Sequence, residues 1–251
     1  MGILPPPREY YLQHICNSFF CKYVPLHLQS PRRHTPTDEP QFFFTEGKID
    51  GSLRRYTPQL EVVSSQEDPA FRLLHEDGNN EGILEHLVLL PDGSFYWTED
   101  EELGEKSAES YYQFSRGVDC QNGMLYLASE GEQALFVLDL DKKVYVKEEW
   151  SDKSGGYPSE VVYLPAFDGN TPMLFITDGH GVKDAGVFVR TDDGKYTKFL
   201  ESDENTAFFT GLSFTPDGKS MYVAMEREDN EDELFVVTRE DGLPFNGPTK
   251  M

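Results

Sequence analysis

The stretch ILEHLVLLPDGSFYWTED, Ile83 to Asp100, has the pattern of two β-strands joined by a tight turn. Its centre is Pro91-Asp92-Gly93, in which proline presets φ and glycine accepts a left-handed backbone. Apolar and aromatic residues flank this tripeptide on both sides, as they do in β-hairpins. The stretch therefore predicts a hairpin. The hairpin pattern does not explain why the acidic residue Asp100 stands at its end.

The same order of strand, turn and strand recurs along the chain, which indicates a repeat fold. The corresponding turn is Gln121-Asn122-Gly123 in one later unit and Pro216-Asp217-Gly218 in the last. The further units are Phe42 to Val63, which is the weakest, Arg116 to Tyr145, Ser159 to Glu201, and Thr210 to Asp241.

The units start at intervals that suit a propeller. The starts at Leu84, Gly117, Glu160 and Gly211 are 33, 43 and 51 residues apart, and four-stranded propeller blades repeat every ~40 to 50 residues. The spacing predicts an all-β protein, a β-propeller of four-stranded blades, of which about five can be counted. A β-sandwich has the same alternation and turn signals and is the alternative. No stretch has convincing helical periodicity.

Residues 1–40 differ in character from the rest of the chain. They contain Pro5-Pro6-Pro7 and the partly basic run QSPRRHTPTDEP, so the sequence predicts a poorly structured leader over 1–40 and one propeller domain over 41–251. The start, MGILPPPREYY, has neither the basic region nor the apolar region of a signal peptide. No segment reaches the ~20 apolar residues that span a bilayer, so we expect no insertion into a membrane.

The charge balance restricts the class of partner. The chain has 45 acidic and 22 basic residues, and its net charge is −23. Nucleic acids are polyanions that attract basic surfaces, so we expect no nucleic-acid partner. Cations are the natural partners of an acidic surface, although a net charge of this sign is also common because it keeps a protein soluble.

Acidic residues follow strands at similar places in several units, and a propeller gathers such places around one axis. Calcium takes ~6 to 8 oxygen ligands, which a ring of carboxylates and carbonyls can supply. For each residue taken singly, a solvated loop carboxylate is the alternative. The candidate metal ligands are Asp100, Glu130, Glu160, Asp178 and Glu226.

Other chemistry has weaker signals. His180 lies between glycines in DGHGV and is either a group for acid–base catalysis or ligation, or a plain loop histidine. The chain has no GxSxG, Walker or HExxH motif. Three cysteines indicate neither a disulfide framework nor a zinc site, and Cys120 is interpreted as a buried small side chain rather than a nucleophile.

Several runs together resemble a known family. They are LEHLVLLPDGSFYWTEDEELGEKSAESYY, LYLASEGEQALFVLDLD, TGLSFTPDGKSMYVAM and VTREDGLPFNG. From about Gly47 to Gly247 the chain resembles the β-propeller proteins related to the alkaline phosphatase PhoX, especially their eukaryotic, algal-looking branch. The resemblance implies a central channel that holds calcium and iron and hydrolyses phosphate monoesters, in a secreted or periplasmic protein. In such a site the metal ions neutralise the phosphoryl oxygens and activate the nucleophile.

The chain departs from this family at several expected ligand positions. Arg116-Gly117 stands where a Glu-Gly pair is expected, and Pro158-Ser159-Glu160 keeps only Glu160 of an expected polar pair. Glu204 is separated from Thr210, and Glu226 stands where glutamine is more usual. A substituted ligand can abolish metal binding, so the departures bear on catalysis and leave the expected fold unchanged.

Three functions follow as hypotheses. The first is a metal-dependent phosphoester hydrolase that acts on a small phosphorylated substrate, with Arg116 as a phosphate contact and His180 as a further catalytic candidate. The second is a non-catalytic propeller that binds calcium or a protein partner on an acidic face. The third is a calcium-dependent lactonase or esterase, which fold analogy alone suggests.

Overall fold

The computed structural model describes residues 20–24, 41–57, 83–150, 156–166, 171–178, 185–191, 193–202, 207–227 and 232–247, with the backbone alone for 20–24. These residues are mostly β-strand, which confirms the all-β prediction. The strands form four antiparallel sheets. The first sheet has the order β1 (Phe20–Val24), β2 (Gln41–Thr45), β3 (Arg54–Thr57), β4 (Ile83–Leu89) and β5 (Phe95–Thr98).

The other three sheets follow in chain order. The second contains β6 (Ser115–Gln121), β7 (Met124–Ser129), β8 (Ala134–Asp139) and β9 (Val144–Glu149). The third contains β10 (Pro158–Leu164), β11 (Met173–Asp178), β12 (Gly186–Arg190) and β13 (Tyr196–Glu201). The fourth contains β14 (Ala207–Phe214), β15 (Ser220–Arg227) and β16 (Glu233–Thr238).

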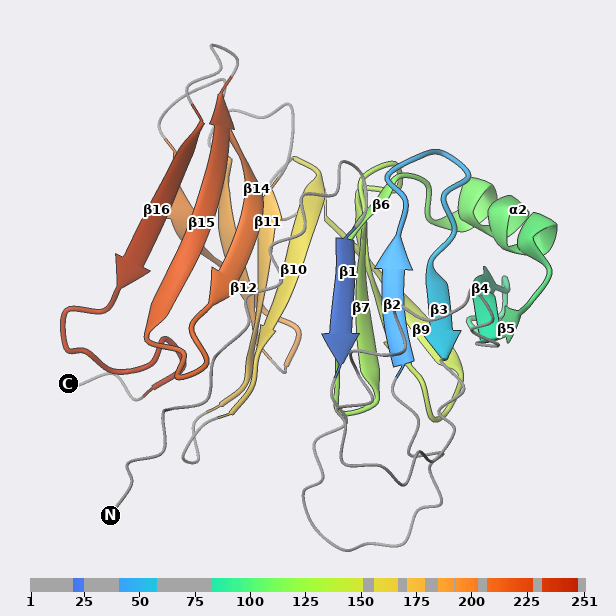
Figure 1. The fold of residues 1–251 in the computed structure, drawn as a ribbon, viewed down its shortest axis with the longest axis horizontal. Coiled ribbons are helices and arrows are strands. Elements are labelled where there is room, and N and C mark those ends of the chain that lie inside the picture. Colours follow the sequence, from blue (N-terminus) through green and yellow to red (C-terminus); the bar gives the residue numbers. More distant parts are fainter. Residues whose placement is uncertain are drawn as a thin grey trace, which may run out of the picture.

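The sheets stand in a row, with their first strands next to one another. β6 contacts β1 and β2 of the first sheet, β10 contacts β6, and β14 contacts β10. Figure 1 shows the fourth sheet on one side of the molecule and the β4–β5 hairpin on the opposite side. Chain order therefore matches spatial order along the row.

The three predicted turns have the conformation that their residues favour. Gly93, Gly123 and Gly218 have φ values of 84°, 76° and 66°, which only glycine adopts without strain. They join β4 to β5, β6 to β7 and β14 to β15. The hairpin predictions at these positions are confirmed.

The first two predicted units share one sheet, which differs from the expectation of a blade for each. Arg54 of β3 pairs with His86 of β4, so the weak unit supplies strands beside β4 and β5. The β4–β5 hairpin is thus the last pair of strands in its sheet, whereas β6–β7, β10–β11 and β14–β15 are the first pairs in theirs. The sequence repeat aligned the β4–β5 hairpin with the other three, although these hairpins occupy different places in their sheets.

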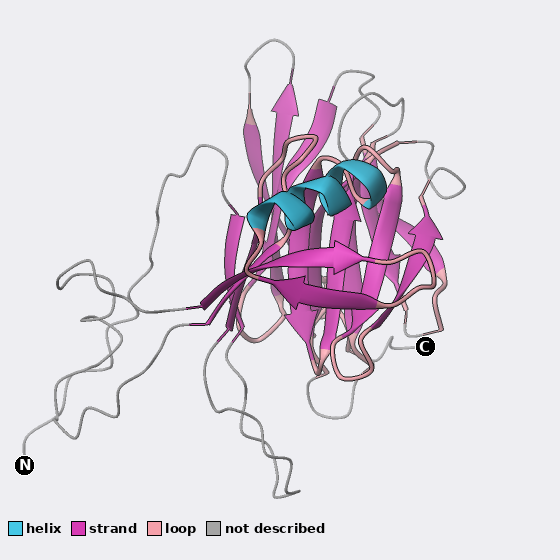
Figure 2. Cartoon of the chain, turned by 90° about the vertical axis from the view of Figure 1, so that its right-hand side faces the viewer, coloured by secondary structure: helices cyan, strands magenta, loops and turns pink. Residues whose placement is uncertain are grey.

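The helix α2 (Glu101–Tyr111) occupies a stretch where no helix was predicted. Its buried residues are Gly104, Ser107 and Ala108, all small. Small residues at helical spacing give little apolar periodicity, which is why the pattern was missed. Gly104 lies so close to β4 that a Cβ there would be 2.3 Å from the Cβ of His86, and Figure 2 shows the helix lying across the strands.

The strand β1 lies inside residues 1–40, the segment predicted to be a poorly structured leader. Its residue Phe20 pairs with Thr45 of β2, and Val24 pairs with Gln41. The structure therefore differs from the prediction at these five residues.

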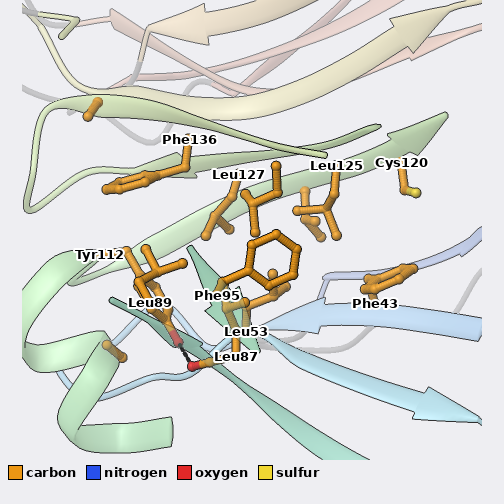
Figure 3. Packing of buried hydrophobic residues seen from close by; sticks show 14 residues of the cluster. Phe43, Leu53, Leu87, Leu89, Phe95, Tyr112, Cys120, Leu125, Leu127 and Phe136 are labelled. Carbon is orange, nitrogen blue, oxygen red and sulfur yellow. Dashed lines mark hydrogen bonds between the residues drawn. The ribbon is translucent and has the colours of Figure 1, made fainter. Parts of the chain in front are cut away.

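Three apolar clusters fill the spaces between neighbouring sheets. The first joins the first and second sheets and includes Leu87, Leu127 and Phe136. In it, the buried hydroxyl of Tyr112 donates to the carbonyl oxygen of Leu87 at 2.7 Å (Figure 3). The second and third sheets, and then the third and fourth, are joined in the same way. Burial between sheets, rather than within one closed sheet, holds the row together.

Candidate functional site at the bulged strand ends

The first strands of three neighbouring sheets each contain a β-bulge near their start. The register shifts between Ser115 and Val118 in β6, between Pro158 and Val161 in β10, and between Phe209 and Gly211 in β14. A bulge adds a residue, bends the strand and re-aims side chains, and bulges are enriched beside functional sites. Two predicted site residues, Arg116 and Glu160, lie at these bulges.

The strands β6 and β10 come closest where their bulges meet. A Cβ on Gly117 would lie 2.4 Å from the carbonyl oxygen of Ser159 and 2.5 Å from the amide nitrogen of Val161. These are backbone atoms, which cannot move aside as a flexible side chain can. Glycine is required here because the two backbones leave no room for a side chain.

Arg116 forms an ion pair with Glu130, the residue that follows β7. The Nε atom of Arg116 lies 2.7 Å from Oε2 of Glu130, and the side chains are 37% and 25% exposed. The backbone carbonyl of Arg116 accepts a hydrogen bond from the hydroxyl of Thr45 at 2.5 Å. The predicted phosphate contact and a predicted metal ligand thus neutralise each other at the junction of the first two sheets.

Three predicted acids occupy equivalent places in their sheets. Glu130 directly follows β7, Asp178 ends β11, and Glu226 is the last residue but one of β15. Each lies at the end of its hairpin where the first strand begins, since Asp178 pairs with Pro158 and Glu226 with Phe208. The three positions are therefore equivalent within their sheets, as the repeat predicted, and their role as metal ligands stays a prediction.

Asp178 is fully buried, and its Oδ1 accepts a hydrogen bond from Nε1 of Trp150 at 2.8 Å. Trp150 directly follows β9, so this bond joins the second sheet to the third. The indole also packs edge-on against Phe188 and Tyr196. Sequence reasoning missed Trp150, although a lone tryptophan after an exposed charged strand is a signal for an anchored side chain.

Glu160 and Glu226 differ from Asp178 in their exposure. Glu160 is half-buried, and its backbone N–H donates to the hydroxyl of Thr177 at 2.9 Å, which satisfies a group displaced by the bulge. Glu226 is exposed on β15. The equivalent positions therefore have unlike surroundings.

Asp100 does not belong with the other acids. It is the N-cap of α2, and its Oδ1 accepts a hydrogen bond from the amide of Leu103 at 3.2 Å. Its strand, β5, lies at the edge of the first sheet. The equivalence assumed for Asp100 was wrong because the β4–β5 hairpin is the outer pair of its sheet, and a capping role explains the acid at this position.

His180 and Glu204 lie outside the described residues. Within the described ranges, no three histidine, cysteine, aspartate or glutamate side chains are grouped so that they could hold a metal ion. In these ranges Glu130 is paired with Arg116, and Asp178 accepts a hydrogen bond from Trp150.

Cys120 is buried, with 7% of its surface exposed. Burial, and secondarily the charge of Asp119, raise the pKa of its thiol to about 12. A thiol in this state is a poor nucleophile. The structural interpretation of Cys120 is therefore confirmed.

Comparisons with known proteins add no identification. No protein-family model matches the chain, and no curated protein matches it. Among the described helical residues, none form a helix with the length and apolar character needed to cross a membrane.

Proposed function

We propose that this chain is a β-propeller that acts as a non-catalytic binding protein, with the four sheets as blades. Support comes from the order of the sheets and the adjacency of β6, β10 and β14, since first strands line the axis of a propeller. The equivalent bulges near the starts of these strands are a further feature that repeated blades share.

The Arg116–Glu130 ion pair is the main observation in favour of a non-catalytic protein. By resemblance, a carboxylate is expected where Arg116 stands. The guanidinium supplies Glu130 with the positive charge that a bound metal ion would supply, and the bond is charge-assisted and short. A site that has its own cation does not need to recruit one.

The charge of the chain supports a binding role. With a net charge of −23, the surface attracts basic segments of other proteins and increases the rate of encounter with them. We therefore propose that the protein recognises a partner and does not hydrolyse a substrate.

Metal content and turnover test the proposal. Protein purified without chelator is assayed for bound calcium and iron, and then for hydrolysis of p-nitrophenyl phosphate and of a lactone after addition of both metals. We expect no retained metal and no turnover. Retained metal together with phosphate-ester turnover would establish the hydrolase hypothesis, and lactone turnover with one calcium would establish the lactonase hypothesis.

The variant Arg116→Glu sharpens this test. It restores the carboxylate expected by resemblance and leaves Glu130 without its partner, so calcium should raise the Tm of the variant and leave the Tm of the wild type unchanged. The control is Lys147→Glu, which breaks a similar pair, Lys147 with Glu132 at 3.0 Å, away from the bulges. An equal response of both variants to calcium would contradict the argument from Arg116.

A further inference from the structure

The strand β16 forms an edge that is unusual in this molecule. Among the described strands it pairs only with β15, and its sheet has three strands where the second and third sheets have four. Four consecutive apolar residues, Leu234 to Val237, lie on it. Leu234 is 68% exposed and Val236 is 56% exposed. The fourth sheet thus ends in an exposed apolar strand.

The outermost strands of the neighbouring sheets are protected in a way that β16 is not. β9 carries Lys147, Glu148 and Glu149, and β13 carries Lys198 and Glu201. Charged residues on an edge strand prevent it from pairing with another chain. In β16 the charged residue is Glu233, at its start, and the four residues Leu234–Val237 have no charge, which is a feature of edges that another strand covers.

An open groove runs beside this edge. It has a volume of about 540 Å³ and is lined by residues of β13, β14, β15 and β16, among them Leu200, Val223 and Phe235. Between the second and third sheets, Glu148 of the outermost strand β9 contacts Arg190 and Tyr196 of the facing sheet. In the same way, side chains of a fourth strand beside β16 would face β13 across the groove.

We infer that the β16 edge binds an extended segment of a partner protein, apolar at alternate positions and flanked by lysine or arginine. Backbone hydrogen bonds to β16 would add it as a fourth strand, and every second side chain would enter the groove. The inference names a surface and a partner class for the binding role proposed above, and so rests on it.

The charge of the surroundings selects this occupant. Asp232 and Glu233 at one end of β16 and Glu240 beyond the other end are exposed, and basic flanks on the incoming strand complement them. A second copy of the chain would bring another net charge of −23 to the same edge, which opposes self-association.

Peptide binding tests the inference. The probe is a fluorescent peptide of alternating valine and threonine with two lysines at each end, KKVTVTVTKK, titrated with the intact protein and followed by anisotropy. Two further peptides serve as controls: EEVTVTVTEE reverses the end charges, and KKVTVPVTKK cannot form a continuous strand. We expect the first to bind at least about tenfold more tightly than either control, and more weakly as salt rises.

Matched variants locate the site. Leu234→Ser combined with Val236→Ser removes exposed apolar contacts from β16 and should weaken binding of KKVTVTVTKK at least about tenfold. Val144→Ser combined with Val146→Ser makes the same change on β9, where the residues are 43% and 59% exposed, and should leave binding unchanged. Equal effects of the two pairs would overturn the assignment to β16.

Hydrogen exchange distinguishes the other occupants. Amides of β16 should exchange quickly in the protein alone and become protected when the peptide binds. A concentration-dependent dimer that the β16 variant abolishes, or full protection of β16 before peptide is added, would overturn the inference in favour of a second copy or another segment of this chain. Phosphate-ester turnover would refute the proposed function without affecting these readouts, and absence of peptide binding would refute the β16 site without affecting the metal analysis.

Discussion

Glu148 on β9 and Arg190 on β12 form a two-pronged ion pair between the second and third sheets. Arg190 Nη2 lies 2.6 Å from Oε1 of Glu148, and Arg190 Nε lies 2.9 Å from Oε2. The hydroxyl of Tyr196 donates to the same carboxylate. Hydrogen bonding to Glu148 is the main reason why the pKa of Arg190 lies above its ordinary value. The pair is mostly buried, with side chains 12% and 22% exposed.

The first prediction concerns this pair. Glu148→Ala leaves a buried guanidinium without its partner and should lower the free energy of unfolding by about 3 kcal/mol, near the lower end for broken buried pairs. Glu149→Ala on the same strand, where the side chain is 56% exposed, should change it by less than about 0.5 kcal/mol. Urea unfolding measures both, and equal effects would show that the pair contributes nothing beyond surface charge.

The second prediction concerns the contact between bulges. Gly117→Ala places a Cβ against the backbone of Ser159 and Val161, so it should destabilise the protein by at least about 2 kcal/mol. In Gly47→Ala the new Cβ comes within 3.1 Å of the side-chain tip of Arg116, which can move, and the cost should be well below that of Gly117→Ala. Thermal unfolding of the two variants decides the comparison, and similar losses would show that β6 and β10 can separate here.

The third prediction uses the N-cap of α2. Asp100→Ala removes the acceptor for the amide of Leu103 and should cost about 1 kcal/mol. Asp100→Ser keeps a capping oxygen, so it should recover most of this loss even though it removes the charge. If the serine variant were as unstable as the alanine variant, the carboxylate would have a role other than capping.

The fourth prediction is a pH dependence that originates at His86. This residue is 3% exposed, and its Nδ1 lies 2.8 Å from the hydroxyl of Ser52. Burial, followed by the positive charge of Arg54, lowers its pKa below the ordinary 6.5. The unfolded chain therefore binds more protons below pH 6.5, so the stability due to neutral His86 is present above pH 6.5 and is lost as the pH falls through the lowered pKa.

Two variants isolate this effect. His86→Gln should flatten the fall in unfolding free energy between pH 6.5 and pH 5, whereas Ser52→Ala should lower stability at pH 7 and keep the slope. Urea titrations at several pH values give the slopes. An unchanged slope in His86→Gln would assign the pH dependence to carboxylates elsewhere.

Local sequence patterns predicted part of this fold correctly. The turns at Gly93, Gly123 and Gly218 were predictable because a left-handed backbone requires particular residues within a few positions. The helix α2 was not, because its buried face is made of Gly104, Ser107 and Ala108 and lacks an apolar stripe. Large apolar residues produce a readable pattern, and small ones that allow close approach do not.

The candidate site was predictable to a similar extent. The repeat placed Glu130, Asp178 and Glu226 at equivalent strand ends, because each follows or ends the second strand of a hairpin and so lies opposite the start of the first strand. The repeat could not tell that Arg116 neutralises Glu130 or that Trp150 binds Asp178. Those contacts depend on how separate strands and sheets meet.

The sequence by itself determined the tight turns, the strands that flank them and the net acidic charge, since each depends on residue type and on neighbours close along the chain. The tertiary structure alone decided that β3 joins β4 in one sheet, that Asp100 caps a helix, and that the apolar edge of β16 is exposed. The physical reason is the sequence separation of the contacts. Glu148 and Arg190, for example, are 42 residues apart and belong to different sheets. Such contacts depend on the burial of whole strands against one another, which no local pattern specifies.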